Sequence, residues 1–265
     1  MNPDLELALE LCEVADALTL VRFRAADLLV ETKPDLTPVS EVDRAVEVAV
    51  RDRLAVARPA HSVLGEELGA APVEGADWRW LVDPIDGTKN YVRGIPVFAT
   101  LLALQHGDET VLGVVSAPAL GRRWWAARGE GAYVDGRPAR VSLVGNLHAA
   151  LLSYDDVVAF SNRGVSDQFA TLAGRCWRAR SYSDFWGHML VAEGAAEAMV
   201  QAEPGAKVWD LAPLQVIVEE AGGRFSDLDG NPGPNGGTAI SSNGLVHEEV
   251  VASLRSPAPQ SSATS

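Results

Sequence analysis

Apolar residues recur at helical spacing in several parts of the chain. From residue 4 to about residue 30, Leu5, Leu9 and Cys12 begin a stripe that predicts a helical hairpin or one long bent helix. A second stripe follows Ser40, a residue type that often caps helices, and ends before Arg58-Pro59. The same criteria predict helices over residues 169–176, 185–200, 209–220 and 247–254.

Short apolar runs bounded by turn residues predict strands between these helices. They cover residues 61–65, 79–83, 96–104, 111–117, 123–127, 131–134, 149–154 and 238–241. The four runs between residues 96 and 134 are joined by turns of ordinary length, which predicts an antiparallel meander. Strands interleaved with helices in both halves predict an α+β fold in which helices cover two sheets.

The pattern changes around residues 143–150, which suggests two halves within one compact unit. We expect an N-terminal half over residues 1–142 and a C-terminal half over residues 143–255, with the active site between them. Residues 256–265 are rich in Ser, Pro and Ala, a composition typical of a disordered tail.

The stretch Trp80-Leu81-Val82-Asp83-Pro84-Ile85-Asp86-Gly87-Thr88-Lys89-Asn90 combines a buried strand with polar chemistry. Pro84 cannot donate a ladder hydrogen bond, so the strand is predicted to stop there and to leave the Ile85 carbonyl unpaired. That carbonyl and the carboxylates of Asp83 and Asp86 form an all-oxygen set, which suits a hard cation such as magnesium.

Gly87 and Thr88 follow at the predicted start of a short helix. Their backbone N–H groups would have no intrahelical partner and could hold a phosphate. A magnesium site beside a phosphate site indicates metal-assisted phosphate chemistry. The alternative is that Asp-Pro-x-Asp-Gly is only a surface turn, because these residue types dominate turns.

Other acidic residues could reach the same place, and each has a purely structural alternative. Glu66 and Glu67 follow a predicted strand but could form a solvated turn. Asp43 and Asp210 stand at predicted helix starts, where capping or the helix dipole would explain them. Lys33 lies between helix breakers and could be a surface lysine or a phosphate contact.

Charge and cysteine content narrow the class of protein. The chain has 22 basic and 36 acidic residues, a net charge of −14, which disfavours binding to nucleic acid or anionic membranes. A phosphate substrate is also an anion, so bound cations must dominate the local charge. The two cysteines are far apart in the sequence, which favours a reducing compartment. The acidic N-terminus does not resemble a signal peptide, and the longest apolar run, residues 95–104, is too short to span a membrane. We therefore expect a cytoplasmic protein.

Three motifs together resemble the inositol monophosphatase family of magnesium-dependent, lithium-sensitive phosphatases. They are Glu66-Glu67 after a glycine, Asp83 to Thr88, and Trp209-Asp210, in the family's order and at its separation. The resemblance extends from Lys33 to Asn243. It implies a layered α-β-α-β-α sandwich of the inositol monophosphatase and fructose-1,6-bisphosphatase type, and a homodimer.

The resemblance also implies a set of magnesium ligands. A first ion would be held by Glu66, Asp83 and the Ile85 carbonyl, and a second by Asp83, Asp86 and Asp210. The family also allows a third, weaker ion near Glu66.

Catalytic roles follow from the same resemblance. Glu66 would help to hold the ion that activates the attacking water, and Thr88, hydrogen-bonded to Asp43, would orient that water and relay its proton. The N–H groups of Gly87 and Thr88 would bind the phosphate, and Asp210 would contact the substrate as well as the metal.

Two further acids bear on the substrate, a small phosphate monoester. Glu203, seven residues before Asp210, falls at the family's substrate-hydroxyl acid, and Asp184 stands where inositol enzymes carry a small residue. An added carboxylate favours a cationic substrate, unless Asp184 only caps a helix beginning at Phe185.

The stretches at residues 86–94 and 122–129 resemble the branch that dephosphorylates L-histidinol phosphate in histidine biosynthesis, the second in its actinobacterial form. L-histidinol phosphate is therefore the expected substrate. The alternatives are an inositol-phosphate or broad sugar phosphatase of the same family, and a non-catalytic metal-binding regulatory protein.

Overall fold

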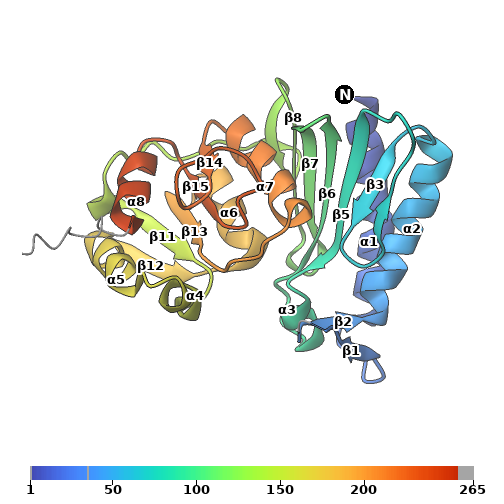
Figure 1. Ribbon diagram of the computed structural model, residues 1–265, viewed down its shortest axis with the longest axis horizontal. Coiled ribbons are helices and arrows are strands. Elements are labelled where there is room, and N and C mark those ends of the chain that lie inside the picture. The colour runs from blue at the N-terminus through green and yellow to red at the C-terminus, as the bar shows by residue number, and fades with distance from the viewer. Residues whose placement is uncertain (1, 35, 256–265) are drawn as a thin grey trace, which may run out of the picture.

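The computed structural model describes residues 2–34 and 36–255, so the predicted tail lies outside the described residues. The chain forms five stacked layers, alternating helices and sheets (Figure 1). This is the α-β-α-β-α arrangement predicted from the sequence. No helix in the described ranges is long and apolar enough to cross a membrane.

The first layer contains helices α1 (Pro3–Arg22) and α2 (Glu41–Ala57). Ser40 begins α2 through a capping box, as predicted. The expected hairpin or long helix to residue 30 is wrong. Thr19 is the last buried residue of α1, and the exposed residues beyond it offer no packing to continue the helix. The chain instead turns into a small antiparallel pair, β1 (Val30–Thr32) and β2 (Pro38–Ser40).

The second layer is an eight-stranded sheet with the order β10-β9-β8-β7-β6-β5-β3-β4. The predicted meander is confirmed, because each strand from β5 to β10 pairs antiparallel with the next. The sequence pattern missed the short strands β4 and β10. The strands are β3 (Ser62–Gly65), β4 (Gly69–Ala71), β5 (Trp78–Asp86), β6 (Ala99–His106), β7 (Glu109–Ala117), β8 (Arg122–Ala127), β9 (Gly131–Val134) and β10 (Arg137–Pro138).

Strand β5 does not stop at Pro84, which corrects the prediction. It continues to Asp86, but its register with β6 shifts between Asp83 and Asp86. The shift follows from two backbone groups. Pro84 has no N–H to donate, and the Ile85 N–H turns to Asp83 Oδ1 at 3.0 Å. The Ile85 carbonyl accepts a side-chain hydrogen bond from Thr88 at 2.9 Å.

The third layer holds α6 (Asp184–Ala192) and α7 (Val208–Glu220), between the two sheets. The prediction of helix to residue 200 is wrong. Gly194 turns the chain with a φ of 76°, and the following segment pairs in the second sheet as β13 (Ala198–Gln201). Helix α7 ends before Gly222, whose φ of 91° is the left-handed conformation typical of a glycine just after a helix.

The fourth and fifth layers complete the C-terminal region. The five-stranded sheet has the order β12-β11-β13-β15-β14, and β11 runs parallel to both of its neighbours. The elements are β11 (Leu151–Tyr154), β12 (Arg178–Ser181), β14 (Arg224–Ser226) and β15 (Ala239–Ser242), covered by α4 (Val157–Asn162), α5 (Ser166–Arg175) and α8 (His247–Leu254).

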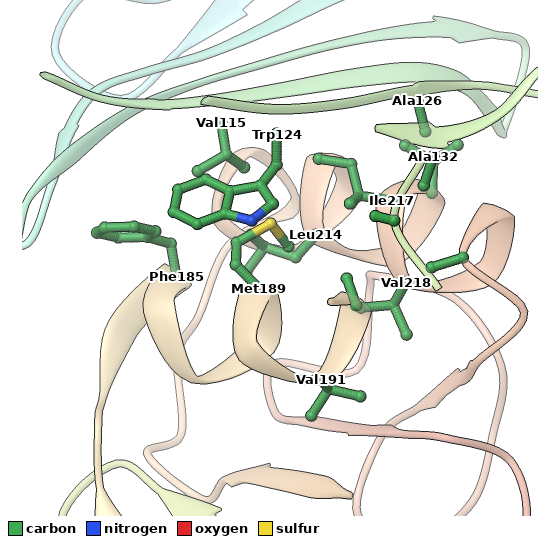
Figure 2. Close-up of a cluster of buried hydrophobic side chains, with 14 of the residues drawn as sticks. Val115, Trp124, Ala126, Ala132, Phe185, Met189, Val191, Leu214, Ile217 and Val218 are labelled. Atoms are coloured by element: carbon green, nitrogen blue, oxygen red, sulfur yellow. The ribbon is translucent and has the colours of Figure 1, made fainter. Parts of the chain in front are cut away.

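The middle helices bury their apolar side chains against both sheets. Trp124 of β8 lies against Phe185 and Met189 of α6, with Leu214 and Ile217 of α7 beside them (Figure 2). All five side chains are almost completely buried, and burial of side chains this large contributes about 1.5–3 kcal/mol each. The helices that follow β12 and β13 are therefore held firmly over the first sheet.

Gly113 of β7 lies in close contact with helix α7. A Cβ atom at Gly113 would lie 2.8 Å from Pro213 Cα. Gly113→Ala should therefore lower the free energy of unfolding by about 1–3 kcal/mol, as expected for overpacking. Thermal unfolding should show a melting temperature several degrees lower.

Gly174→Ala in α5 is the matched control, because no neighbouring atom lies within 4 Å of the added Cβ. It should leave stability unchanged or slightly raised, since alanine is the better helix former. Equal melting temperatures for the two variants would contradict the tight packing at Gly113.

Candidate active site

Asp83 lies at the centre of a group of acids where the register between β5 and β6 shifts. It is 2% exposed, and its Oδ1 accepts the Ile85 N–H. Burial raises the pKa of the Asp83 carboxyl well above its usual range, and the nearby carboxylates of Glu66, Asp86 and Asp210 raise it further. The structure thus brings together the four acids predicted as metal ligands.

Asp86 connects this group to the middle layer of helices. Its Oδ2 accepts the Phe185 N–H at 2.8 Å, so it caps α6 from 99 residues away in sequence. Burial and the charges of Asp184 and Asp210 raise the pKa of Asp86. The sequence indicates Asp86 as a candidate ligand but carries no local signal for this cap.

Asp210 serves as a helix cap and also belongs to the acidic group. Its Oδ2 accepts the Lys207 N–H at 2.7 Å at the start of α7, which confirms the capping alternative. Its carboxylate also acts on Asp83 and Asp86, and burial raises its own pKa. The capping role and the predicted place among the acids are therefore compatible.

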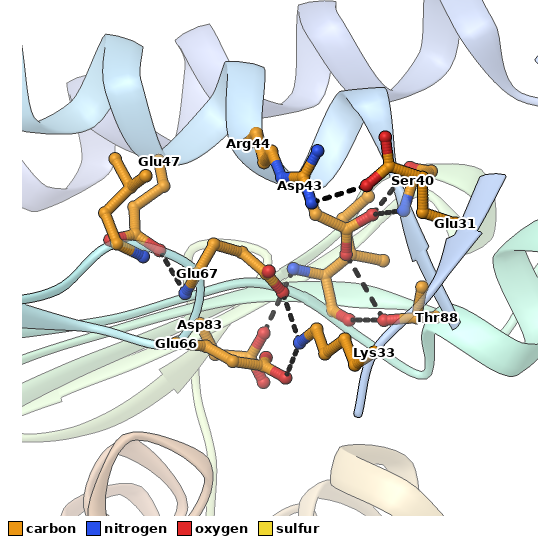
Figure 3. A network of polar contacts seen from close by, with 12 residues as sticks. Glu31, Lys33, Ser40, Asp43, Arg44, Glu47, Glu66, Glu67, Asp83 and Thr88 are labelled. Atoms are coloured by element: carbon orange, nitrogen blue, oxygen red, sulfur yellow. Dashed lines mark hydrogen bonds and ion pairs between the residues drawn. The ribbon is translucent and has the colours of Figure 1, made fainter. Parts of the chain in front are cut away.

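Lys33 provides positive charge at the edge of the acidic group (Figure 3). Its Nζ lies 2.7 Å from Glu66 Oε1 and 2.6 Å from Glu67 Oε1. Burial lowers the pKa of Lys33, but hydrogen bonds to the two carboxylates outweigh it and raise the pKa. Lys33 is therefore more than a surface lysine, and Glu67, whose side chain is 5% exposed, is not part of a solvated turn.

Asp43 joins the start of α2 to Thr88. Its Oδ2 accepts the Ser40 backbone N–H at 2.8 Å, and its Oδ1 accepts the Thr88 hydroxyl at 3.2 Å. The capping alternative is thus confirmed for one oxygen, while the other makes the contact predicted for catalysis. Burial raises the pKa of Asp43 despite these hydrogen bonds.

Gly87 allows the chain to turn from β5 into the short helix α3 (Thr88–Val92). Its φ is 82°, and a Cβ there would lie 2.9 Å from the Val97 carbonyl oxygen. The first helical hydrogen bonds run from Asn90 and Tyr91 to the Gly87 carbonyl. The N–H groups of Gly87 and Thr88 precede them, as expected in the first turn.

Glu47 supports the loop that carries Glu66, and the sequence analysis missed it. It is fully buried, pairs with Arg51 at 2.7 Å, and accepts the N–H groups of Glu67 and Leu68 at 2.7 and 3.2 Å. A Cβ at Gly65 would overlap the Glu47 carboxylate, so the loop needs glycine there. The available signal was the spacing of four residues from Asp43, which places both acids on one helix face.

Asp184 faces the first half of the chain at the start of α6. Its Oδ2 accepts the Asn90 side-chain amide at 3.1 Å, and Ser183 and Asp184 have φ values of 50° and 45°. The capping alternative for Asp184 is wrong, because α6 begins at Asp184 itself and the Phe185 N–H is bound by Asp86. Two successive non-glycine residues with positive φ are strained, a feature that tends to cluster at functional sites.

Glu203 lies close enough to influence Asp184. Burial raises the pKa of Asp184, and the charges of Glu203 and Asp155 raise it further, whereas Lys89 lowers it. Asp155 was not recognised in the sequence as a candidate. The structure thus places a second set of acids beside Asp86, distinct from the group around Asp83.

The donor set around Asp83 fits a hard divalent cation in its chemistry. Carboxylate oxygens predominate, and their mutual repulsion would be relieved by a bound cation. Within residues 2–34 and 36–255, however, no three acidic, histidine or cysteine side chains are already arranged to hold an ion.

Known proteins resemble the whole chain. The inositol monophosphatase family model matches residues 2–258. The chain is 52% identical over 258 residues to the histidinol-phosphatase of Mycobacterium tuberculosis, covering 96% of this chain and 98% of that protein. It is 49% identical over 260 residues to the histidinol-phosphatase of Streptomyces coelicolor, covering 95% and 96%.

A solved structure shares the fold. It is an IMPase/NADP phosphatase complexed with NADP and Ca2+, with a TM-score of 0.83 and 25% identity, covering 96% of this chain and 95% of that one. The family and fold predicted from the sequence are therefore confirmed.

Glu47→Gln tests the support of the Glu66 loop. The amide would place an N–H group against Arg51 or the loop N–H groups, so stability should fall by about 1–3 kcal/mol. Because Glu66 is carried by this loop, the magnesium concentration for half-maximal activity should rise several-fold. Thermal unfolding and a magnesium titration of phosphate release measure the two effects. Glu10→Gln, on the solvent-exposed side of α1, should change neither, and equal behaviour of both variants would contradict the role of Glu47.

Proposed function

The chain belongs to the inositol monophosphatase family, and we propose that it hydrolyses L-histidinol phosphate to L-histidinol and phosphate in histidine biosynthesis. The strongest support is the identity of about half the residues, over nearly the whole chain, to two proteins named histidinol-phosphatase. The function predicted from the sequence agrees with those names. A phosphatase for inositol or other sugar phosphates is the alternative within the family.

Five residues would hold magnesium in this proposal: Glu66, Asp83, Ile85 through its carbonyl, Asp86 and Asp210. We propose two ions, with a third, weaker one near Glu66. Bound magnesium supplies positive charge that acidifies water and stabilises the attacking and leaving oxygens. The raised pKa of Asp83, caused by burial and neighbouring carboxylates, supports a cation at this place.

Thr88 and Asp43 would move the proton of the attacking water. The Thr88 hydroxyl has one proton and lies within hydrogen-bond distance of both Asp43 Oδ1 and the Ile85 carbonyl. When it donates to Asp43, its oxygen can accept a hydrogen bond from the water. Asp43 is buried and held by Ser40, and its raised pKa suits a proton acceptor. The N–H groups of Gly87 and Thr88 would bind the phosphate oxygens.

The substrate would bring a negative phosphate and a positive ammonium group to this site. Its phosphate would lie by Gly87 and Thr88, with Asp210 contacting the ester side, while Asp184 and Glu203 would face its cationic groups. Asp184 is fixed for such a role by Asn90 and by the strained turn before α6. A neutral sugar ring would leave these acids without a counter-charge.

We also propose a cytoplasmic homodimer. Both described cysteines are free thiols, as expected in a reducing compartment. Light scattering after size exclusion should give about twice the 28.1 kDa mass of the chain.

Phosphate release from a panel of esters tests the proposed function. With magnesium, L-histidinol phosphate should be hydrolysed with a kcat/KM at least about tenfold above that for inositol 1-phosphate, fructose bisphosphate or adenosine 3′,5′-bisphosphate. EDTA should abolish release, and added magnesium should restore it. Faster hydrolysis of inositol 1-phosphate would favour the alternative, and no release from any ester would favour a non-catalytic metal-binding protein.

Asp184→Asn tests the choice of substrate. The variant keeps an oxygen for Asn90 but loses the charge, so kcat/KM for L-histidinol phosphate should fall about tenfold or more. Hydrolysis of inositol 1-phosphate should be little affected. Asp167→Asn, an exposed acid in the first turn of α5, is the control. An unchanged preference in Asp184→Asn would support the broad sugar phosphatase.

A further inference from the structure

Three acids follow the carboxyl ends of three neighbouring parallel strands. Strand β11 lies between β12 and β13 and is parallel to both, so all three end at the same edge of the sheet. Asp155 follows β11 directly, Asp184 follows β12 after two residues, and Glu203 follows β13 after one. Ligand sites in sheets with parallel strands typically lie at this edge.

Asp155 stands after the central strand and links the other two acids. Its Oδ2 accepts the Glu203 N–H at 2.8 Å, and its charge acts on Asp184. Asp155 is 9% exposed, and its Oδ1 is buried without a well-aligned hydrogen-bond partner among the described residues. Burial raises the pKa of the Asp155 carboxyl, while backbone N–H groups of Glu203, Asp156 and Ala202 lower it. A buried acceptor without a partner is costly, and a bound donor would remove that cost.

Within residues 2–34 and 36–255, no positive side chain forms an ion pair with these three carboxylates, although the charge of Lys89 acts on Asp184. Other partly buried acids of the fold do have such partners, for example Asp16 with Arg123 at 2.7 Å and Glu193 with Arg122. The hydrogen bond from Asn90 to Asp184 brings no charge. The cluster therefore carries negative charge that a cationic ligand could balance.

We propose that Asp155 is a specificity residue that binds the ammonium group of the substrate together with Asp184 and Glu203. This inference rests on the proposed function, in which the substrate is an amino-alcohol phosphate. An ammonium has three N–H donors and suits three acceptors from three strands. Asp155 would accept through Oδ1, while its Oδ2 holds the backbone of Glu203 in place.

Asp155→Asn tests this role, because the amide is nearly isosteric and can still accept the Glu203 N–H. Kinetics should be compared for L-histidinol phosphate and for the same ester with its amine replaced by hydrogen. For the amine substrate, KM should rise about tenfold while kcat changes less than about threefold. For the ester without the amine, both constants should remain close to those of the wild type.

Asp156→Asn is the matched control, since Asp156 is exposed and only caps α4 through the Val158 N–H. It should behave as the wild type with both esters. If Asp155→Asn melts far below the wild type, Asp155→Ser also removes the charge with a smaller side chain and is measured in the same comparison.

The outcomes separate this inference from the proposed function. If the wild type prefers the amine ester and the Asp155→Asn variant prefers it to the same extent, only the role of Asp155 is overturned. Equal losses for both esters in folded Asp155 variants indicate a structural role and also overturn it. A wild type that does not distinguish the two esters contradicts both the inference and the proposed substrate.

Discussion

Between Asp83 and Asp86 the ladder that joins β5 to β6 loses its register, because Pro84 has no N–H and the Ile85 N–H turns to the Asp83 side chain. The consequences extend through the site. The Ile85 carbonyl becomes available to Thr88, two carboxylates lie at one strand end, and Gly87 can redirect the chain into α3. A regularly paired strand would have alternated these side chains between the two faces of the sheet and occupied their backbone groups.

The layer of helices between the sheets supplies the acids of the site that β5 does not carry. Helix α7 packs against the first sheet at Gly113 and presents Asp210 at its first turn. Helix α6 begins at Asp184 and is capped by Asp86, so one carboxylate of the first half fixes the helix that carries an acid of the second. The apolar contacts around Trp124 hold both helices in place. Packing of the core and geometry of the site therefore depend on the same two helices.

The sequence predicted the elements whose signals are local. The cap at Ser40 and the meander depend on nearby residues, and both are confirmed. The strand end expected at Pro84 is wrong, because β5 continues to Asp86 with a shifted register. Contacts between distant segments were not predictable, such as the Asp86 cap of α6 or the loop support by Glu47. Helix propensity also gave a wrong prediction over the alanine-rich residues 193–200, because Ala198–Gln201 pairs as β13. Tertiary pairing there outweighs a weak local preference.

An acidic protein that acts on an anion must separate its negative charge from the phosphate. Two sets of carboxylates achieve this in different ways. Asp83 at the centre of the first set is deeply buried, and the raised pKa values of Asp83, Asp86 and Asp210 favour a divalent cation that the phosphate can also bind. The set around Asp155 lies at the strand ends and has no ion pair among the described residues. An ammonium on the substrate would neutralise the second set while metal neutralises the first, so a zwitterionic ester complements the site at both ends. A neutral sugar phosphate would satisfy only the metal end, which is why the charge pattern favours the amino-alcohol ester.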